Sequence, residues 1–562
     1  MWAKILLLFF VFSFLFRTDY SFDQDLGRHL RLGEIILQTK SVPQTNLFSY
    51  TYPDFPFINS HWLFEVLVYL GQQTIGLQAL LFLKVAIILL AVWLVLKVVP
   101  KNQYLLLPIG FIFLHTLRER PELRPEILSF LFTGATFYLL DRYEKTKTKL
   151  IFTLPLIQLL WVNSHIYFIV GLFLQAIYLV HLGYQHLRSH PKGVNINKFV
   201  ADAIKPLGVI FLLSVMASLI NPSGIRGFLN PLTFNQNYGY TIVENQTMFF
   251  LENIGFRNPN FLFVKLATGI IILSILIAFF KRRLLLKNLG LAGLGLLLTM
   301  LNVRSFPYLA LISFPAVLEN FGAAKSFLWT KMLISITAAL LLIESFLYLN
   351  GSYYKYTDSD TNPRLEFKEG GRGALDFVLK NNLPQPVFNN FDIGSYITYR
   401  AYPKYRIFVD GRPGEYPKEF FQEVYIPVQY EPQKFKELDQ KLSFKTIIFS
   451  HTDQTPWGKA FLASIVKNPG WKTVYLDDFM IVLVKSDVAS QGDTLESIDL
   501  SKLDPAAYSY NSYISYLRLS LFLVQIGHPE SAEKFARTGL SLFPQSPLGN
   551  TLFGIKKTRF FW

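Results

Sequence analysis

The chain has 562 residues, of which 51% are hydrophobic, 16% aromatic and only 17% charged. Soluble domains carry about 25% charged residues, and the mean hydropathy here is +0.31. This composition excludes a disordered chain and a purely soluble enzyme, and it indicates a membrane protein. The absence of cysteine excludes disulfides, thiolate metal sites and thiol nucleophiles. The net charge of +15 is typical of basic cytoplasmic loops and affinity for membrane lipids, so we expect no nucleic-acid partner.

Apolar segments predict about eleven transmembrane helices, several of them shorter than the ~20 residues that cross a bilayer upright. They are expected at 2–17, 77–98, 103–117, 125–140, 150–163, 166–185, 206–220, 261–280, 288–302, 305–320 and 327–349. The first segment lacks a small-residue cleavage site, which favours a retained anchor over a signal peptide. Segment 61–76 is also apolar, but counting it as a span would place the basic loop 142–149 outside. We therefore expect it to lie along the outer surface.

The Lys and Arg residues of the predicted loops indicate the orientation of the chain. Loops that face the cytoplasm when the N-terminus is cytoplasmic carry more cations than the outer loops before the last span. This bias predicts a multi-pass protein of the cytoplasmic (plasma) membrane with an extracytoplasmic C-terminal region.

The sequence divides into four parts. Residues 1–350 form the predicted transmembrane domain, whose outer loop 18–76 contains amphipathic helices. A polar linker, 351–364, precedes a small extracytoplasmic α/β domain at 365–490. Residues 500–562 are predicted to contain a helical hairpin, because 505–548 has the pattern of two amphipathic helices.

Within the α/β domain the hydrophobic pattern alternates between helix and strand. Helices are expected at 373–382, 393–401, 433–442 and 457–467, and strands at 386–390, 405–410, 445–450 and 471–485. The last strand is either continuous or a hairpin that turns at Asp477 and Asp478. In the C-terminal hairpin, Gly527, Ala532 and Pro544 suit a tetratricopeptide-like unit. A single repeat is weak evidence, and packing against the α/β domain is the structural alternative.

Polar residues close to the ends of the predicted spans gather on the outer side. Ionisable groups near membrane depth are costly and tend to line cavities, which predicts one polar cavity at the outer leaflet. The predicted substrate-binding residues in this part are His61, Glu65, Arg124, Asn163, His165 and Arg304. Arg124 and Arg304 suit phosphate, because guanidinium groups bind phosphate oxygens bidentately. The alternatives are ordinary water-exposed loops, and arginines that snorkel or form salt bridges at the interface. Glu65 is either a second acid or an ion-pair partner.

Segment 22–39 carries the predicted catalytic residues, Asp25, Asp23 and His29. Asp25 and His29 are four residues apart and therefore stack on one helix face. A carboxylate beside an imidazole suits general-base activation of a hydroxyl. Asp23 or Asp25 can instead cap the helix, and His29 can serve packing. Together with His61 these residues can also hold a divalent cation, although their spacing is not diagnostic and metal dependence stays open.

At these residues the chain resembles a known family. The order is an acidic loop after the first span, then HWLFEVL, RPEILSFLF, WVNSHIYFIVGL, NPSGIRGFLNPL, VRSFPYLAL and FNNFDIGSYITYR…YRIFVDGRPGEY. This order resembles bacterial members of the GT-C superfamily, the polytopic glycosyltransferases that use polyprenyl-phosphate sugars, over about residues 20–420.

The resemblance implies a catalytic carboxylate at Asp25, with Asp23 as the alternate, and lipid-phosphate binding at Arg124 and Arg304. Where many relatives place an aromatic pair before the motif histidine, this chain has Gly27 and Arg28.

Asp410 and Arg412 lie in a second pair of motifs, in the α/β domain. Asn389, Asp392 and Gly394 open a helix after a strand, and Asp410-Gly411-Arg412 ends the next one. Asp-Gly at a strand end is often a simple turn. Otherwise Asp410 and Arg412 form the lower lip of the cavity and contact an acceptor.

These features predict an α-helical polytopic membrane glycosyltransferase with an inverting mechanism. It would transfer a sugar from a polyprenyl-phosphate donor to an unknown hydroxyl acceptor at the outer face of the membrane. One alternative is a transporter or flippase, which predicts intramembrane charges on both halves of the protein. The other is a non-catalytic envelope assembly protein that recruits partners through residues 351–562.

Overall fold

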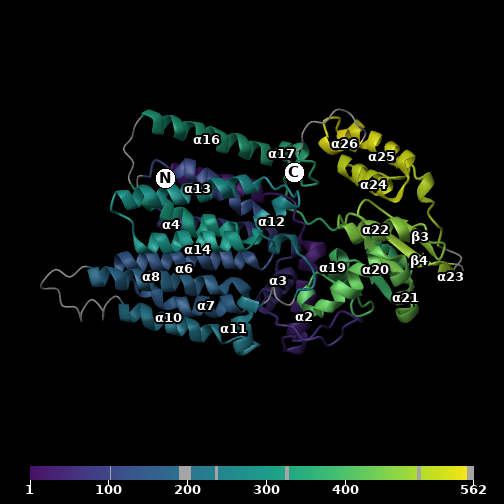
Figure 1. Ribbon diagram of the computed structural model, residues 1–562, viewed down its shortest axis with the longest axis horizontal. Helices are drawn as coiled ribbons and strands as arrows, with labels where there is room; N and C mark the ends of the chain where they lie inside the picture. Colours follow the sequence, from purple (N-terminus) through teal and green to yellow (C-terminus); the bar gives the residue numbers. More distant parts are fainter. Residues whose placement is uncertain (101–102, 189–203, 234–237, 323–327, 490–494, 553–562) are drawn as a thin grey trace.

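The computed structural model describes residues 1–100, 103–188, 204–233, 238–322, 328–489 and 495–552. Long helices run roughly side by side at one end of the molecule, and a small mixed domain with a helical hairpin lies at the other (Figure 1). Segments from both parts meet between them, where α2 and α19 lie close together (Figure 1).

Each predicted apolar segment contains a helix. The bundle comprises α1 (Trp2–Leu15), α4 (Leu77–Val98), α5 (Leu106–His115), α6 (Glu126–Thr146), α7 (Leu154–Val162), α8 (Ile169–Arg188), α10 (Lys205–Ser218), α13 (Asn260–Phe280), α14 (Leu286–Leu301), α15 (Phe314–Phe321) and α16 (Leu328–Leu349). Within the described ranges, four stretches are long and apolar enough to cross a membrane: Leu77–Val98, Ile166–Leu187, Asn260–Phe280 and Trp329–Leu349. These helices indicate a membrane protein, whereas the count of eleven crossings and their orientation stay predictions.

The first outer loop contains two packed helices. A π-helical turn, η1 (Phe22–Leu26), leads into α2 (Gly27–Thr39), and α3 (Trp62–Thr74) packs against α2. Gly33 permits this close approach, because a Cβ atom there would lie 2.1 Å from the carbonyl oxygen of Glu65. The contact holds α2 and α3 together near the ends of the bundle helices.

The mixed domain is built on a four-stranded sheet of order β1-β2-β4-β3. Its strands are β1 (Val387–Asn389), β2 (Thr446–Ser450), β3 (Trp471–Leu476) and β4 (Met480–Lys485). β1 pairs parallel to β2, and β4 pairs antiparallel to both β2 and β3. Alternate residues of β4 enter two separate cores, with Val482 and Val484 in one and Ile481 and Leu483 in the other. Both faces of the sheet are therefore covered, as the period of two in a strand requires.

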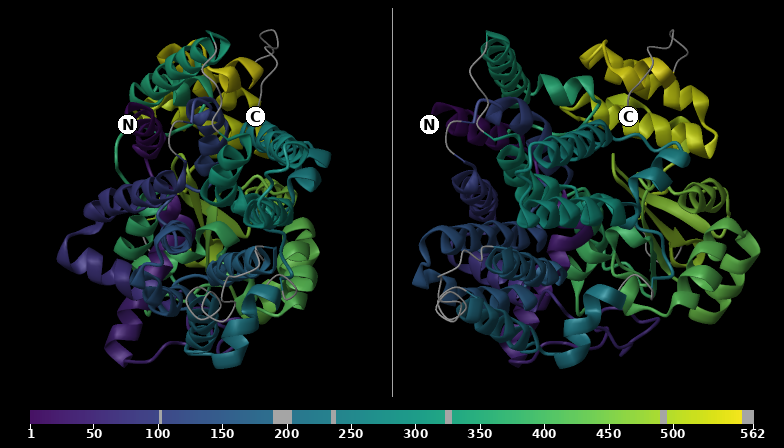
Figure 2. Two further views of the ribbon diagram at one scale, coloured as in Figure 1. Left: turned by 90° about the vertical axis from the view of Figure 1, so that its left-hand side faces the viewer. Right: turned by 60° about the vertical axis from the view of Figure 1, so that its left-hand side comes forward.

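Helices surround this sheet and end in a helical hairpin (Figure 2). The mixed domain contains α18 (Arg372–Lys380), α19 (Gly394–Ala401), α20 (Ile426–Tyr430), α21 (Pro432–Leu442), α22 (Pro456–Ile465) and α23 (Ser486–Ala489). The hairpin consists of α24 (Tyr513–Ile526) and α25 (Pro529–Leu542), followed by α26 (Pro547–Leu552). Gly527 ends α24 with a φ of +92°, in the left-handed region that favours glycine. His451 of the mixed domain packs on Phe522 of α24, their ring centroids 4.7 Å apart.

One predicted strand differs from the structure, and the prediction of a hairpin is confirmed. Residues 405–410 do not form a strand; Ile407 instead makes an isolated parallel bridge with Ser49 of the first outer loop. The apolar alternation that suggested a strand reflects burial against this loop. The prediction of a hairpin within 471–485 is confirmed, because β3 and β4 pair antiparallel around Asp477.

The expected linker 351–364 is not a free tether. It contains α17 (Ser352–Tyr356), and the buried Asp358 accepts a hydrogen bond of 2.8 Å from Ser546. Asp360 forms an ion pair of 3.0 Å with Arg518 of α24. This segment therefore fixes the hairpin to the bundle. The last residues of the predicted hairpin region, 553–562, lie outside the described residues.

Candidate active site

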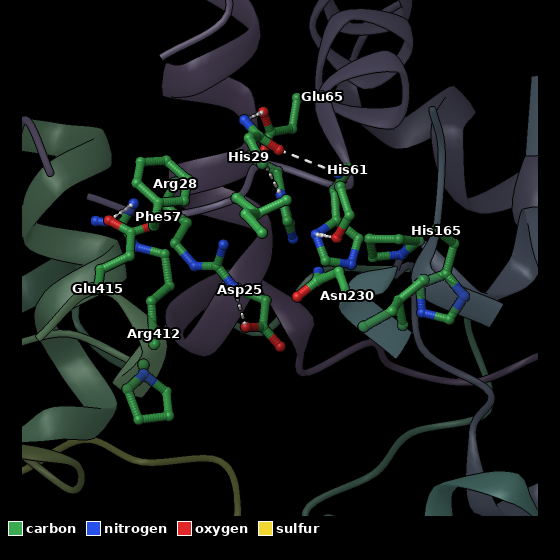
Figure 3. A pocket seen from close by; sticks show the side chains of 18 of the residues that line it. Asp25, Arg28, His29, Phe57, His61, Glu65, His165, Asn230, Arg412 and Glu415 are labelled. Carbon is green, nitrogen blue, oxygen red and sulfur yellow. Dashed lines mark hydrogen bonds and ion pairs between the residues drawn. The ribbon is translucent and has the colours of Figure 1, made fainter. Parts of the chain in front are cut away.

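A cavity of about 680 Å³ lies where the first outer loop, the bundle ends and the mixed domain meet (Figure 3). Eight of the predicted site residues line it: Asp25, His29, His61, Glu65, Arg124, His165, Arg304 and Arg412. They come from η1, α2, α3, the ends of several bundle helices, and the loop after Ile407. Residues far apart in the chain thus form one polar site.

Three predicted residues do not line the cavity. Asp23 accepts a hydrogen bond of 2.7 Å from the backbone N–H of Gly370, so its carboxylate contacts the mixed domain. Asn163 accepts a 2.7 Å bond from the indole N–H of Trp62 and acts as a local brace. Asp410 is fully buried and accepts a 2.5 Å bond from the guanidinium group of Arg412. Of the two candidate carboxylates in segment 22–39, only Asp25 faces the cavity.

Asp25 is held between two guanidinium groups. Its Oδ1 lies 2.8 Å from Arg28, and its Oδ2 lies 3.1 Å from Arg124. Burial alone would raise the pKa of Asp25, but Arg124 and Arg28 together hold this pKa well below its usual value. Asp25 is therefore ionised near neutral pH.

The predicted phosphate-binding arginines converge on a carboxylate that the sequence analysis did not select. Glu244 lies 2.5 Å from Arg304 and 3.2 Å from Arg124, and it also pairs with Arg120. Burial opposes ionisation, but the three arginines hold the pKa of Glu244 below its usual range. Glu126 contacts Arg304 at 3.4 Å and also pairs with Arg120. Three cations thus surround one anionic position.

The expected pairing of Asp25 with His29 is not the hydrogen bond that forms. His29 Nδ1 lies 3.1 Å from Glu65 Oε1, and the other oxygen of Glu65 accepts a 2.8 Å bond from Asn59. Because burial lowers the pKa of His29, its contact with Glu65 is a hydrogen bond and not a pair of opposite charges. The role of Glu65 in substrate binding stays a prediction. The ring centroid of His61 is 5.9 Å from that of His29. Burial and the neighbouring His29 lower the pKa of His61 to about 4, so His61 is neutral near pH 7.

His165 forms the opposite wall of the cavity (Figure 3). Its Nδ1 lies 2.7 Å from the hydroxyl of Ser129, which also accepts a 2.7 Å bond from Trp161. The imidazole stacks on Tyr167, with ring centroids 5.2 Å apart. These contacts fix the ring at the cavity surface.

The mixed domain contributes the remaining wall through residues 411–415. Arg412 pairs with the buried Asp410 and with Glu415, and its guanidinium group lies 4.9 Å from the ring centroid of Phe48. Asp410 therefore positions Arg412 from behind, whereas Arg412 itself reaches the cavity. The sequence proposed both as a lip; the structure places only Arg412 on the cavity surface.

Two further observations bear on ligands. The side-chain amide of Asn245 lines the cavity, and both its buried N and O atoms are without a hydrogen-bond partner in the described part of the chain. Asp23, Asp25, His29 and His61 do not converge, and the described residues contain no group of three or more His, Asp or Glu placed to hold a metal. A divalent cation stays a sequence prediction.

The fold is similar to that of solved oligosaccharyltransferases. The archaeal oligosaccharyltransferase AglB from Archaeoglobus fulgidus, solved with an inhibitory peptide and a dolichol-phosphate, matches with a TM-score of 0.52 and 12% identity. The match covers 97% of this chain and 86% of that one. A second structure of the Archaeoglobus fulgidus oligosaccharyltransferase, tethered to an acceptor peptide, matches with a TM-score of 0.51 and 12% identity, over 86% and 74% of the two chains. No protein-family model and no curated protein matches the chain. The chain therefore has a GT-C-like fold.

Proposed function

We propose that this protein is a membrane glycosyltransferase that transfers a sugar from a polyprenyl-phosphate donor to a hydroxyl acceptor at the outer face of the cytoplasmic membrane. The observation that carries the proposal is the cavity in which Asp25 lies beside Arg124 and Arg304. A carboxylate next to clustered guanidinium groups combines a proton acceptor with a phosphate site. A volume of about 680 Å³ lies in the range of small-molecule sites.

The donor phosphate would occupy the position that Glu244 now fills. Arg120, Arg124 and Arg304 surround that carboxylate, and phosphate oxygens carry the same charge in a geometry that guanidinium groups bind well. The unpartnered amide of Asn245 is next in sequence and can both donate to and accept from a sugar hydroxyl. The three arginines would thus recognise the phosphate, and Asn245 would recognise the sugar.

In the proposed reaction, the acceptor oxygen attacks the anomeric carbon while the bond from that carbon to the phosphate oxygen breaks. The electron pair of the broken bond leaves with the polyprenyl phosphate, whose growing negative charge the arginines stabilise. Asp25 accepts the proton of the acceptor hydroxyl. Attack opposite the leaving phosphate would invert the anomeric centre.

The binding of the donor would also prepare Asp25 for this step. Arg124 holds Asp25 in its ionised form and thereby makes it a weak base. A phosphate that attracts Arg124 would weaken this contact and raise the proton affinity of Asp25. The catalytic base would then be strongest when donor is present.

The flippase alternative predicts a charged cavity at the other ends of the bundle helices as well. At the opposite ends of α6 and α14, Lys287 lies 2.8 Å from Glu144 and 3.5 Å from Glu319. The space beside these groups is about 10 Å³. These charged groups pair with one another, and the space beside them is too small for a lipid-linked substrate. Both observations favour a structural role for Lys287, Glu144 and Glu319.

The experiment that tests the proposal compares two neighbouring carboxylates in the full chain. Membranes or purified protein receive radiolabelled polyprenyl-phosphate sugars together with a membrane extract as acceptor source, and transfer of label is followed. Asp25→Asn is expected to lower turnover by at least 100-fold, because the amide cannot accept the proton. Asp23→Asn is the matched control and is expected to retain turnover, since Asp23 faces away from the cavity.

Full turnover by Asp25→Asn would remove Asp25 from the reaction. Equal losses in both variants, with equal losses of folded protein, would indicate a structural role for the whole segment. Movement of labelled lipid across liposomes without sugar transfer would favour the flippase instead.

A further inference from the structure

A second cavity, of about 160 Å³, lies at the ends of α1, α13 and α16. Its lining is Phe14, Arg17, Arg118, Pro121, Pro259, Asn260, Tyr348, Tyr353 and Tyr354. None of these residues lines the first cavity. The two sites are therefore separate, and the second one has no part in the proposed transfer reaction.

The wall of this second cavity carries two cations and no carboxylate. Arg17 lies 2.6 Å from Glu122, and Arg118 lies 3.1 Å from Glu344, but neither glutamate lines the cavity. The carboxylates thus orient the guanidinium groups from behind. An anion entering the cavity would meet positive charge first.

Two groups of this cavity, the Tyr354 hydroxyl and the Arg17 guanidinium group, can each donate a further hydrogen bond to a ligand. The hydroxyl of Tyr354 is buried, with the residue 3% exposed, and has no hydrogen-bond partner in the described residues. Leaving a buried hydroxyl unpaired costs about 1–3 kcal/mol. Arg17 uses one nitrogen for Glu122, and the described residues supply it with no other side-chain hydrogen bond or ion pair. Tyr354 is among its electrostatic neighbours. A phosphate oxygen would satisfy both groups at once.

The two helices that end at the cavity also carry exposed apolar side chains, on faces turned away from Asn260 and Tyr348, which line the cavity. Leu262 and Leu266 of α13 and Ile343 and Phe346 of α16 are exposed large hydrophobic side chains. Both helices carry stretches that are long and apolar enough to cross a membrane, so these side chains face lipid. A ligand with a charged head and an apolar chain matches this combination of surfaces.

We propose that this second cavity binds the phosphate headgroup of a membrane lipid, held by Arg17 and the Tyr354 hydroxyl, at the level where the apolar stretches of α13 and α16 end. The same chemistry is present in glycerophospholipids and in polyprenyl phosphates. Free inorganic phosphate shares the headgroup but lacks the chain. These three ligands form the arms of the test.

Native mass spectrometry of the detergent-solubilised full chain measures the binding directly. The background variant is Arg124→Gln/Arg304→Gln, so that the first cavity does not contribute phosphate binding. Dihexanoyl phosphatidylglycerol, farnesyl phosphate and inorganic phosphate are titrated in turn. We expect one bound lipid phosphate, with at least tenfold weaker binding on Arg17→Gln and several-fold weaker binding on Tyr354→Phe. Arg537→Gln and Tyr356→Phe, both at exposed side chains, are matched controls that should bind as the background does.

The tighter of the two lipids identifies the source of the headgroup. If Arg17→Gln does not fold, Tyr354→Phe decides, because it removes one hydroxyl from a buried ring. Unchanged lipid binding in the folded variants would overturn the proposal. Equal affinity for inorganic phosphate and the lipids would overturn the part that concerns a lipid.

Discussion

Asp25 and Glu244 share one cation: the same Nη1 atom of Arg124 lies 3.1 Å from an oxygen of Asp25 and 3.2 Å from an oxygen of Glu244. The two carboxylates come from segments more than two hundred residues apart in the chain. Any anion that replaces Glu244 therefore changes the electrostatic surroundings of Asp25. In the proposed reaction, Arg124 would therefore couple phosphate binding to the strength of Asp25 as a base.

Glu244→Gln is expected to strengthen product binding, because a neutral amide competes less well for the three arginines. The concentration of polyprenyl phosphate that inhibits transfer by half should fall about five- to tenfold. Glu252→Gln is the matched control, since Glu252 pairs at the surface with Lys265. Weaker inhibition in Glu244→Gln would mean instead that Glu244 organises the arginines for phosphate.

Asp23→Asn is expected to stabilise the protein at neutral pH. Burial raises the folded-state pKa of Asp23 from 3.8 to about 7, despite hydrogen bonds from Gly370 and Gly371. Between these values the folded state binds the proton more tightly than the unfolded state. The contribution of Asp23 is therefore present below about pH 4 and is lost as the pH rises towards 7.

The measurement is the unfolding temperature of wild type and variant between pH 4 and pH 8. As the pH rises from 4 to 8, deprotonation of Asp23 should lower the free energy of unfolding of the wild type by up to about 4 kcal/mol. The unfolding temperature of the variant should change less over the same range. Some slope should persist, because burial also raises the pKa of Asp477 to about 6. Asp376→Asn, at a largely exposed side chain, should leave the profile unchanged. Parallel profiles for wild type and Asp23→Asn would contradict the assignment.

Lys84→Met is expected to destabilise the fold by about 3–5 kcal/mol, because it leaves a buried carboxylate without its cation. Lys84 Nζ lies 2.9 Å from Asp19, and both side chains are almost fully buried. The double variant Asp19→Asn/Lys84→Met should recover part of the loss. Denaturant unfolding in detergent measures the free energy of unfolding of each variant, with Lys97→Met as the control. The pairing argument would be refuted if the double variant lost at least as much free energy of unfolding as Asp19→Asn and Lys84→Met lose together.

Sequence patterns identified the helices well because long apolar runs have few alternative structures. They did not separate Asp23 from Asp25, since both follow the first span, and the π-helical turn η1 decides which one faces the cavity. Residues 405–410 were wrongly predicted as a strand because apolar alternation reports burial and not hydrogen-bond partners.

Glu244 was missed for a related reason. It lies in a short 3₁₀ turn after α11 (Gly224–Thr233), where a lone acid resembles any loop residue. Glu244 can be recognised as a site residue only in the folded structure, where Arg120, Arg124 and Arg304 all pair with it. An unusual excess of arginines near two span ends was the one signal, because such a cluster requires a nearby counter-charge.

The isolated bridge between Ser49 and Ile407, and a second one between Asp19 and Phe367, join the earliest outer segment to the mixed domain. During synthesis, the first fifty residues are made long before their partners exist. Their polar backbone groups stay open to water, chaperones or wrong pairings until the ribosome has passed residue 407. A nascent chain that stops before this point would leave the pocket unfinished, because residues 411–415 form one of its walls. Formation of the site therefore depends on segments that are synthesised late.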